Sequence, residues 1–210
     1  MKKRILVSAS CLALGLINLP AQNGATPAPK SDDPMAGLNL GDSTGTPSTA
    51  GGPASPFVAK FKGHLIVMDH GTPKDFDAST LNGVKYWAFY YSASWCPPCR
   101  AFTPKLVDFY KYFKKSHPNF ELIFVNDDHS EADMLAYMKT DDMTWPAVRF
   151  SDLDDSRLTA RKYCGPGIPD LVLTDENGKV LSDSYNGQDY VGPTKVMDDI
   201  KKMVPQPSGT

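Results

Sequence analysis

The amino-acid sequence predicts an α/β domain with a mixed central sheet flanked by helices on both faces. From residue 57 onward, short apolar runs alternate with segments whose apolar residues have helical spacing. A turn-linked pair of strands and a final helix follow, so antiparallel as well as parallel strands are expected in the sheet. About 150 residues remain for this part, which suits one domain.

Three apolar runs in the first half of the domain are expected to be strands. Residues 64–69 are followed by a Gly-Thr-Pro turn, residues 86–91 are rich in aromatic side chains, and residues 120–125 are apolar except at Glu121. Runs of this length between turn residues are typical of buried strands.

Helices are expected after the second and third of these strands. Ser130 and Asp133 have the spacing of a capping pair, so one helix should begin there. Another should follow residue 99, because apolar residues recur every three or four positions. These residues are Phe102, Leu106, Phe109 and Phe113.

The C-terminal elements are shorter. We expect, in chain order, a helical piece at residues 156–163, a strand at 171–174, a hairpin turn at 175–178, a returning strand that starts at Val180 and Leu181, and a helix at about 193–203.

The first 21 residues have the features of a secretory signal peptide. Three basic residues open the chain, an uncharged apolar run occupies residues 5–19, and Pro20 and Ala21 end it. The run has 15 residues, whereas a membrane-spanning helix needs roughly 20, so cleavage near Ala21 is favoured over an uncleaved membrane anchor. Export to a periplasm, where disulfides persist, is therefore expected.

The remaining chain is expected to divide into a linker at residues 22–56, a domain at 57–204 and a tail at 205–210. The linker contains six Pro, six Gly and eight Ser or Thr, a composition that cannot bury enough apolar surface to fold. Without residues 1–21, which hold three basic and no acidic residues, the formal net charge changes from −2 to −5. An acidic chain without a basic block is a poor partner for nucleic acid.

Cys96 and Cys99 carry the strongest chemical signal. They form a Cys-Pro-Pro-Cys motif between a predicted strand and a predicted helix. The first turn of a helix has unpaired N–H groups and a partial positive charge, which stabilise a thiolate. Pro97 and Pro98 fit that turn, where a missing N–H costs little, and Arg100 adds a positive charge. We expect Cys96 to be the attacking thiol and Cys99 the resolving thiol of a redox-active pair.

A metal site or a haem-attachment site at Cys96 and Cys99 agrees less well with the sequence than a redox-active pair. A zinc site needs four ligands, and the sequence has no second Cys-x-x-Cys motif or paired His motif. A c-type haem needs His where the chain has Arg100. No metal or other cofactor is therefore expected, and a static disulfide remains as an alternative. Cys164 is expected to be a buried, inert thiol, with an additional redox thiol as the alternative.

Residues 95–104 read WCPPCRAFTP and resemble the active-site segment of the tryparedoxin and nucleoredoxin branch of the thioredoxin superfamily. The resemblance extends over roughly residues 60–185 and implies a thioredoxin-like fold. The chain is also similar, in motif placement and expected export, to bacterial reductases of the TlpA and ResA type. Further matching segments lie at residues 105–110, 124–127, 130–133 and 167–169.

The resemblance also implies roles for single residues. Cys96 and Cys99 match the redox pair, and Trp95 matches the aromatic residue beside the nucleophile. Pro169 matches the cis-proline that lies against the disulfide and offers backbone to the substrate peptide. The residues expected to support the site and its substrate are Trp95, Pro97, Pro98, Arg100, Ile168, Pro169 and Asp170.

Three residues depart from the family pattern. Tyr90 stands where thioredoxins carry a buried Asp, so the proton of Cys99 needs another acceptor or water. Asp170 follows the proline, where Thr or a similar small residue is usual, and its carboxylate is expected to disfavour thiolate formation and acidic substrates. Cys164 stands where Gly is common.

These features predict an extracytoplasmic thiol-disulfide oxidoreductase for protein substrates, with the reductase direction favoured. Its expected partners are exported proteins with disulfides or thiols and a membrane thiol that donates electrons, and a monomer is expected. The competing hypothesis is a non-catalytic module that binds extended peptides and uses the disulfide only for stability.

Overall fold

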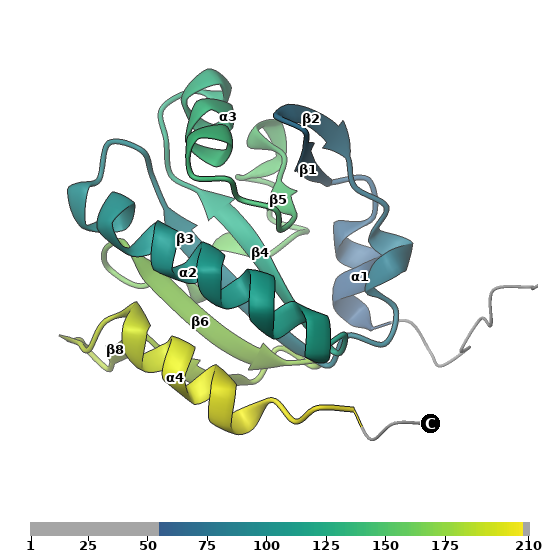
Figure 1. Ribbon diagram of the computed structural model, residues 1–210, viewed down its shortest axis with the longest axis vertical. Coiled ribbons are helices and arrows are strands. Elements are labelled where there is room, and N and C mark those ends of the chain that lie inside the picture. The colour runs from purple at the N-terminus through teal and green to yellow at the C-terminus, as the bar shows by residue number, and fades with distance from the viewer. Residues whose placement is uncertain (1–54, 208–210) are drawn as a thin grey trace, which may run out of the picture. The chain divides into compact units, whose positions relative to one another are not determined.

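The computed structural model describes residues 55–207, and these form the expected mixed sheet with helices on both faces (Figure 1). The predicted signal peptide and nearly all of the predicted linker lie outside the described residues. The helices are α1 (Pro56–Phe61), α2 (Pro97–Ser116), α3 (Glu131–Thr140) and α4 (Pro193–Met203), with 3₁₀ turns η1 (Ala78–Leu81), η2 (Phe150–Asp152) and η3 (Ala160–Tyr163).

Seven strands form the main sheet of the described part, in the order β2-β1-β5-β4-β3-β6-β7. A separate two-stranded ribbon pairs β8 with β9. The strands are β1 (Leu65–Asp69), β2 (Thr72–Asp75), β3 (Tyr86–Ser92), β4 (Phe120–Asn126), β5 (Ala147–Val148), β6 (Asp170–Asp175), β7 (Val180–Asp183), β8 (Tyr185–Asn186) and β9 (Asp189–Tyr190).

The central strands β3 and β4 run parallel, and α2 connects them. Every residue of β4 is buried, as a parallel pair covered by helices on both faces requires. β6 pairs antiparallel with the other side of β3. Because Ser92 is the partner of Asn126 in the register, β3 and β4 end side by side at one edge of the sheet. The segments that follow these two strands therefore meet there.

Two apolar cores lie between the sheet and its covering layers. Helices α2, α3 and α4 pack on one face, against residues such as Tyr90 and Phe124. Helix α1, η1 and η3 pack on the opposite face, against residues such as Phe89 and Ile123. Successive strand residues point to opposite faces, which explains why apolar residues follow one another without alternation in β3 and β4. In Figure 1, α2 and α4 cross in front of the sheet.

Several short elements were not predicted from the sequence, and the helical piece expected at residues 156–163 is limited to the 3₁₀ turn η3 in its second half. Helix α1 begins at Pro56, with Ser55 as its N-cap, inside the segment expected to be linker. Phe57 and Phe61 of this helix are buried and pack on the ring of Trp87. Strands β5, β8 and β9 were missed as well, because two residues carry too little periodic pattern. The turn expected at Gly71-Thr-Pro is confined to His70 and Gly71, which have positive φ, and strand β2 already begins at Thr72.

The longer elements agree with the predictions. Helix α3 starts after Ser130, whose hydroxyl accepts the N–H of Asp133 at 3.1 Å. Helix α4 has the expected limits, and the chain remains attached beyond it, since the side-chain amide of Asn119 donates to the carbonyl of Pro205 at 3.0 Å. None of the helices within residues 55–207 has the length and apolar character to span a bilayer.

Candidate active site

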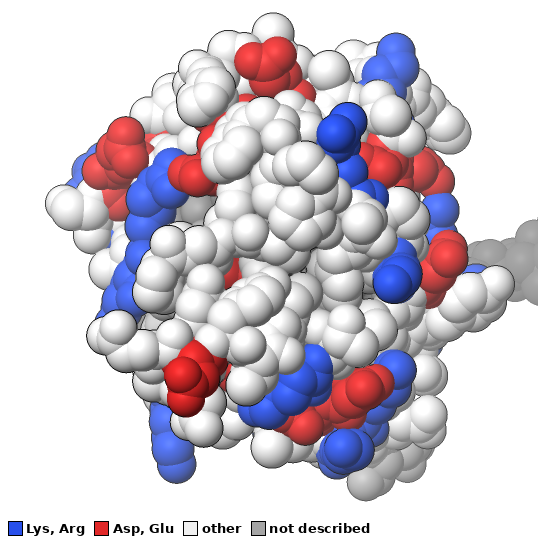
Figure 2. Space-filling model, turned by 90° about the vertical axis from the view of Figure 1, so that its left-hand side faces the viewer, with Lys and Arg blue, Asp and Glu red and all other residues white. Residues whose placement is uncertain are grey.

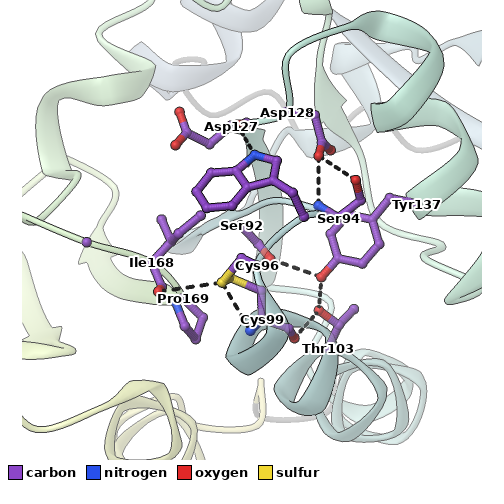
Figure 3. Close-up of a disulfide and its surroundings, with 12 residues drawn as sticks. Ser92, Ser94, Cys96, Cys99, Thr103, Asp127, Asp128, Tyr137, Ile168 and Pro169 are labelled. Atoms are coloured by element: carbon purple, nitrogen blue, oxygen red, sulfur yellow. Dashed lines mark hydrogen bonds between the residues drawn. A yellow bond between two sulfur atoms is a disulfide. The ribbon is translucent and has the colours of Figure 1, made fainter.

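The Cys-Pro-Pro-Cys motif lies where α2 begins, just beyond the end of β3. Cys96 is the N-cap of α2, and Pro97 and Pro98 occupy the first two helical positions. Cys96 and Cys99 form a disulfide, with their Cα atoms 5.2 Å apart (Figure 3). Cys99 is completely buried, whereas Cys96 is 3% exposed. The sulfur of Cys96 is therefore the one that a partner can approach.

The start of α2 stabilises negative charge on the sulfur of Cys96. The backbone N–H of Cys99 donates to Sγ of Cys96 at 3.3 Å, so one of the N–H groups left unpaired at the helix start points at this sulfur. The 20-residue helix adds a partial positive charge at the same place. Arg100 is exposed and forms no ion pair in the described part of the chain. After reduction, Cys96 has the surroundings of a reactive thiolate.

Residues 164–169, here called the proline loop, lie opposite the motif. The Ile168–Pro169 peptide bond is cis, as the family resemblance implied. The carbonyl oxygen of Ile168 lies 3.7 Å from Sγ of Cys96, a distance at which the reduced thiol can donate a hydrogen bond (Figure 3). A cavity of about 450 Å³ opens between the motif and the loop. Its lining consists of Trp95, Cys96, Pro97, Pro98, Asp127 and residues 164–168.

Trp95 forms an exposed wall of this cavity. Its indole N–H donates to the carbonyl of Asp127 at 3.0 Å, and its ring stacks on His129 with the ring centroids 5.8 Å apart. Asp128 accepts the N–H and the hydroxyl of Ser94, each at 2.7 Å. Residues 127–129, which follow β4, therefore hold residues 94–95, which precede the Cys-Pro-Pro-Cys motif, in place.

Sequence reasoning did not assign Asp127, Asp128 or His129 to the site. A usable signal was present, because a polar run, Asn126-Asp-Asp, directly follows a buried strand. Parallel neighbouring strands end at the same edge of a sheet, so residues after β4 must lie near residues after β3. Recognising the two strands as parallel neighbours would have brought these residues together.

A network of buried hydroxyl groups lies beneath Cys99, where thioredoxins carry the buried Asp. The hydroxyl of Thr103 donates to the carbonyl of Cys99 at 2.9 Å and lies 2.8 Å from the hydroxyl of Tyr90. The hydroxyl of Tyr137 lies 2.5 Å from Thr103 and 3.0 Å from the hydroxyl of Ser92 (Figure 3). Burial raises the pKa of Tyr90 and of Tyr137. The network is therefore neutral and cannot accept the proton of Cys99 as a carboxylate would.

Cys164 lines the cavity with a free thiol that is half-buried. Burial and, to a smaller extent, the carboxyl group of Asp170 raise the pKa of Cys164 to about 11. The thiol is therefore protonated near neutral pH, and a protonated thiol is a poor nucleophile. These surroundings favour the interpretation of Cys164 as an inert residue of the cavity wall.

Asp170 lies behind the proline loop and does not face a substrate. It is completely buried, its Oδ2 accepts the N–H of Gly165 at 2.7 Å, and its Oδ1 has no hydrogen-bond partner in the described part. It is absent from the lining of the cavity. The expectation that this carboxylate repels acidic substrates thus has no geometric basis, because the side chain turns toward the loop's own backbone.

We expect Asp170 to make the folded chain less stable as the pH rises from about 4 to 6. Burial raises its pKa to about 6, whereas in the unfolded chain it stays near its usual value of 3.8. Between these values the unfolded chain releases the proton first, so stability falls with rising pH. Asp170→Asn should raise the free energy of unfolding at pH 7 by roughly 2 kcal/mol and by much less at pH 4.

Urea unfolding at pH 4 and pH 7 measures this effect. Asp108→Asn, a substitution of the same kind at an exposed position on α2, is the matched control and should change the free energy of unfolding at neither pH. Equal stabilisation of Asp170→Asn at both pH values would contradict the titration argument.

Comparisons with known proteins agree with this geometry. The family model described as Thioredoxin-like matches residues 83–180. Tryparedoxin II from Crithidia fasciculata has a similar structure, with 31% sequence identity and a TM-score of 0.55, and the match covers 74% of this chain and 97% of that one. The chain belongs to the thioredoxin superfamily. Within it, the similarity places the chain in the tryparedoxin and nucleoredoxin-like branch, a family of oxidoreductases.

Curated relatives of this thioredoxin-like protein are considerably longer. Nucleoredoxin from Xenopus laevis is 37% identical over 127 residues, which cover 60% of this chain but 29% of that protein. Probable nucleoredoxin 1 from Arabidopsis thaliana is 30% identical over 172 residues, which cover 79% of this chain and 27% of that protein. The chain thus matches less than a third of the length of these relatives.

Proposed function

We propose that this thioredoxin-like protein is an extracytoplasmic thiol-disulfide oxidoreductase that reduces disulfides in other proteins. The observation that carries the proposal is the placement of Cys96. Its sulfur caps a 20-residue helix, receives the N–H of Cys99 and borders a cavity next to a free backbone carbonyl. This arrangement suits a thiolate that attacks a disulfide held by its flanking backbone.

The proposed reaction begins with both cysteines reduced. The Cys96 thiolate attacks one sulfur of a substrate disulfide, that disulfide breaks, and the released substrate thiolate takes up a proton. Cys99 then loses its proton, attacks Sγ of Cys96 in the mixed disulfide and releases the second substrate thiol. The Cys96–Cys99 disulfide forms, and two electrons have passed to the substrate. A thiol donor of electrons returns the pair to its reduced form.

Water is the proposed acceptor for the proton of Cys99. The hydroxyl network under this residue is neutral, so its role is to hold the first turn of α2 rather than to titrate. The approach of the two sulfurs depends on that turn, because Cys96 and Cys99 lie at its two ends.

We propose that an uncharged segment of the substrate protein contacts the cavity beside Cys96. Figure 2 shows the end of the molecule where α2 begins, and the centre of this face carries few charged side chains, whereas Lys, Arg, Asp and Glu lie around its periphery. The cavity is lined mainly by Trp95, prolines and glycine backbone, with Asp127 at its side. Such a surface favours an extended apolar peptide over an acidic or basic one.

The expected biological setting belongs to the same proposal. Residues 1–21 would direct export, the substrates would be exported proteins, and a membrane thiol would supply electrons to a monomer. The redox-active disulfide would serve as the working group without a bound cofactor. Within residues 55–207, no three His, Cys, Asp or Glu side chains are grouped so that they could hold a metal ion.

The reduction potential of the Cys96–Cys99 pair tests the proposed direction. The chain without residues 1–21 is equilibrated against thiol buffers, and Cys164→Ser serves as a control that should leave the potential unchanged. A value near roughly −270 mV is expected for a reductase. A value near roughly −120 mV would instead indicate an oxidant. A pair that does not equilibrate at all would support the peptide-binding module.

A further inference from the structure

The β8–β9 ribbon contacts the proline loop through two tyrosine side chains. The hydroxyl of Tyr185 donates to the carbonyl of Gly167 at 3.2 Å, and the hydroxyl of Tyr190 donates to the carbonyl of Pro169 at 2.8 Å. The centroids of the two rings lie 5.1 Å apart. The ribbon therefore binds the loop on both sides of Ile168. In Figure 1, β8 lies at the same end of the sheet as the start of α2.

The carbonyl group of Ile168, between those of Gly167 and Pro169, is the one that faces Sγ of Cys96. The oxygen of Ile168 lies 3.7 Å from Sγ of Cys96, and within residues 55–207 it accepts no other hydrogen bond. An extended peptide that lies along this loop needs a free backbone group with which to pair. Because the neighbouring carbonyls of Gly167 and Pro169 are occupied by tyrosine hydroxyls, Ile168 offers the available acceptor.

The ring of Tyr185 also packs directly on the loop. A Cβ atom at Gly165 would lie 2.5 Å from two carbons of this ring, closer than real Cβ contacts come. The N–H of Gly165 is held from behind by Asp170. The start of the loop is therefore confined between a buried carboxyl group and an aromatic ring.

Hydrogen bonds at Ser184 connect the β8–β9 ribbon to strand β6 of the main sheet. The N–H groups of Val191 and Gly192 donate to the carbonyl of Ser184 at 2.8 and 3.0 Å. The hydroxyl of Ser184 accepts the N–H of Leu171 in β6 at 2.8 Å. Since β6 follows the proline loop directly, the loop and the ribbon that holds it share one rigid support.

We propose that Tyr185 and Tyr190 are positioning residues that hold the backbone of the proline loop in the form that accepts a protein substrate. The proposal rests on the proposed thiol-disulfide exchange. Within residues 55–207 neither tyrosine forms a hydrogen bond with Cys96 or Cys99, so neither is assigned a part in the transfer of electrons. Their effect is confined to substrates whose backbone pairs with the loop and does not extend to small disulfides, which react at Cys96 without such pairing.

Steady-state kinetics of Tyr185→Phe, Tyr190→Phe and the double variant test this role. With dithiothreitol as reductant and insulin as the protein disulfide, each single variant should raise KM about fivefold and the double variant about twentyfold, with kcat unchanged. The rate with 2-hydroxyethyl disulfide should not change. Tyr112→Phe removes the same atom from a tyrosine that is 75% exposed on α2 and should match the unmodified chain in both assays.

Each other outcome has a distinct meaning. An unchanged KM for insulin in an active double variant would overturn the positioning role alone. Equal losses with insulin and with 2-hydroxyethyl disulfide would overturn it too, because they indicate general damage to the site, which thermal unfolding midpoints would show independently. An unmodified chain that reduces neither disulfide would overturn the proposed function, and the role of the tyrosines with it.

Discussion

Replacing Cys99 by Ser should convert the protein into a trap that holds its substrates as mixed disulfides. Cys96 keeps the helix N-terminus that stabilises its thiolate, so its attack on a substrate disulfide continues. The second step fails because no thiol remains to attack Sγ of Cys96. Turnover of a protein disulfide should fall on the order of a thousandfold or more, since the two cysteines act as a unit.

The adducts are measured by non-reducing electrophoresis and mass spectrometry after incubation with exported proteins. They should disappear on reduction and map to Cys96. Cys164→Ser in the same background should leave trapping unchanged, because the raised pKa of Cys164 keeps that thiol protonated. Cys96→Ser together with Cys99→Ser should trap nothing. Adducts that map to Cys164 would contradict the assignment of Cys96 as the nucleophile.

Thr103→Val should lower the free energy of unfolding by about 1–3 kcal/mol, although valine has nearly the same shape. The hydroxyl of Thr103 connects Tyr90, Tyr137 and the carbonyl of Cys99 in a completely buried place. Its removal takes from the hydroxyl of Tyr90 the partner that lies 2.8 Å away, and a buried polar group that loses a hydrogen bond cannot replace it with water. The hydroxyl of Tyr137 keeps Ser92 as a partner, which limits the loss.

Urea unfolding followed by tryptophan fluorescence measures this prediction. Thr140→Val, at an exposed position at the end of α3, is the matched control and should change stability by less than about 0.5 kcal/mol. The double variant Tyr90→Phe, Thr103→Val should cost less than the sum of the two single variants, because it removes both members of one hydrogen bond. A Thr103→Val chain as stable as the control would show that the network contributes nothing.

Local features of the site could be predicted from the sequence because they depend on residues that are close along the chain. The start of α2 at a Cys followed by two Pro, the capping of α3 by Ser130 and the limits of α4 all arise from contacts within about one helical turn. The family resemblance added the proline loop, and the structure contains its cis peptide bond at the expected place.

The sequence by itself determined the alternation of elements and the pair of cysteines at a helix start, whereas the position of the loop that faces them came from the family resemblance. Only the tertiary structure decided what surrounds them: Asp127 and His129 beside Trp95, the inward turn of Asp170, and the tyrosines of the β8–β9 ribbon on the loop. The register of β3 and β4 brings Asp127 and His129 to Trp95, and the packing of the separate β8–β9 ribbon brings the tyrosines to the loop. A pattern that describes each segment separately contains no information about that register.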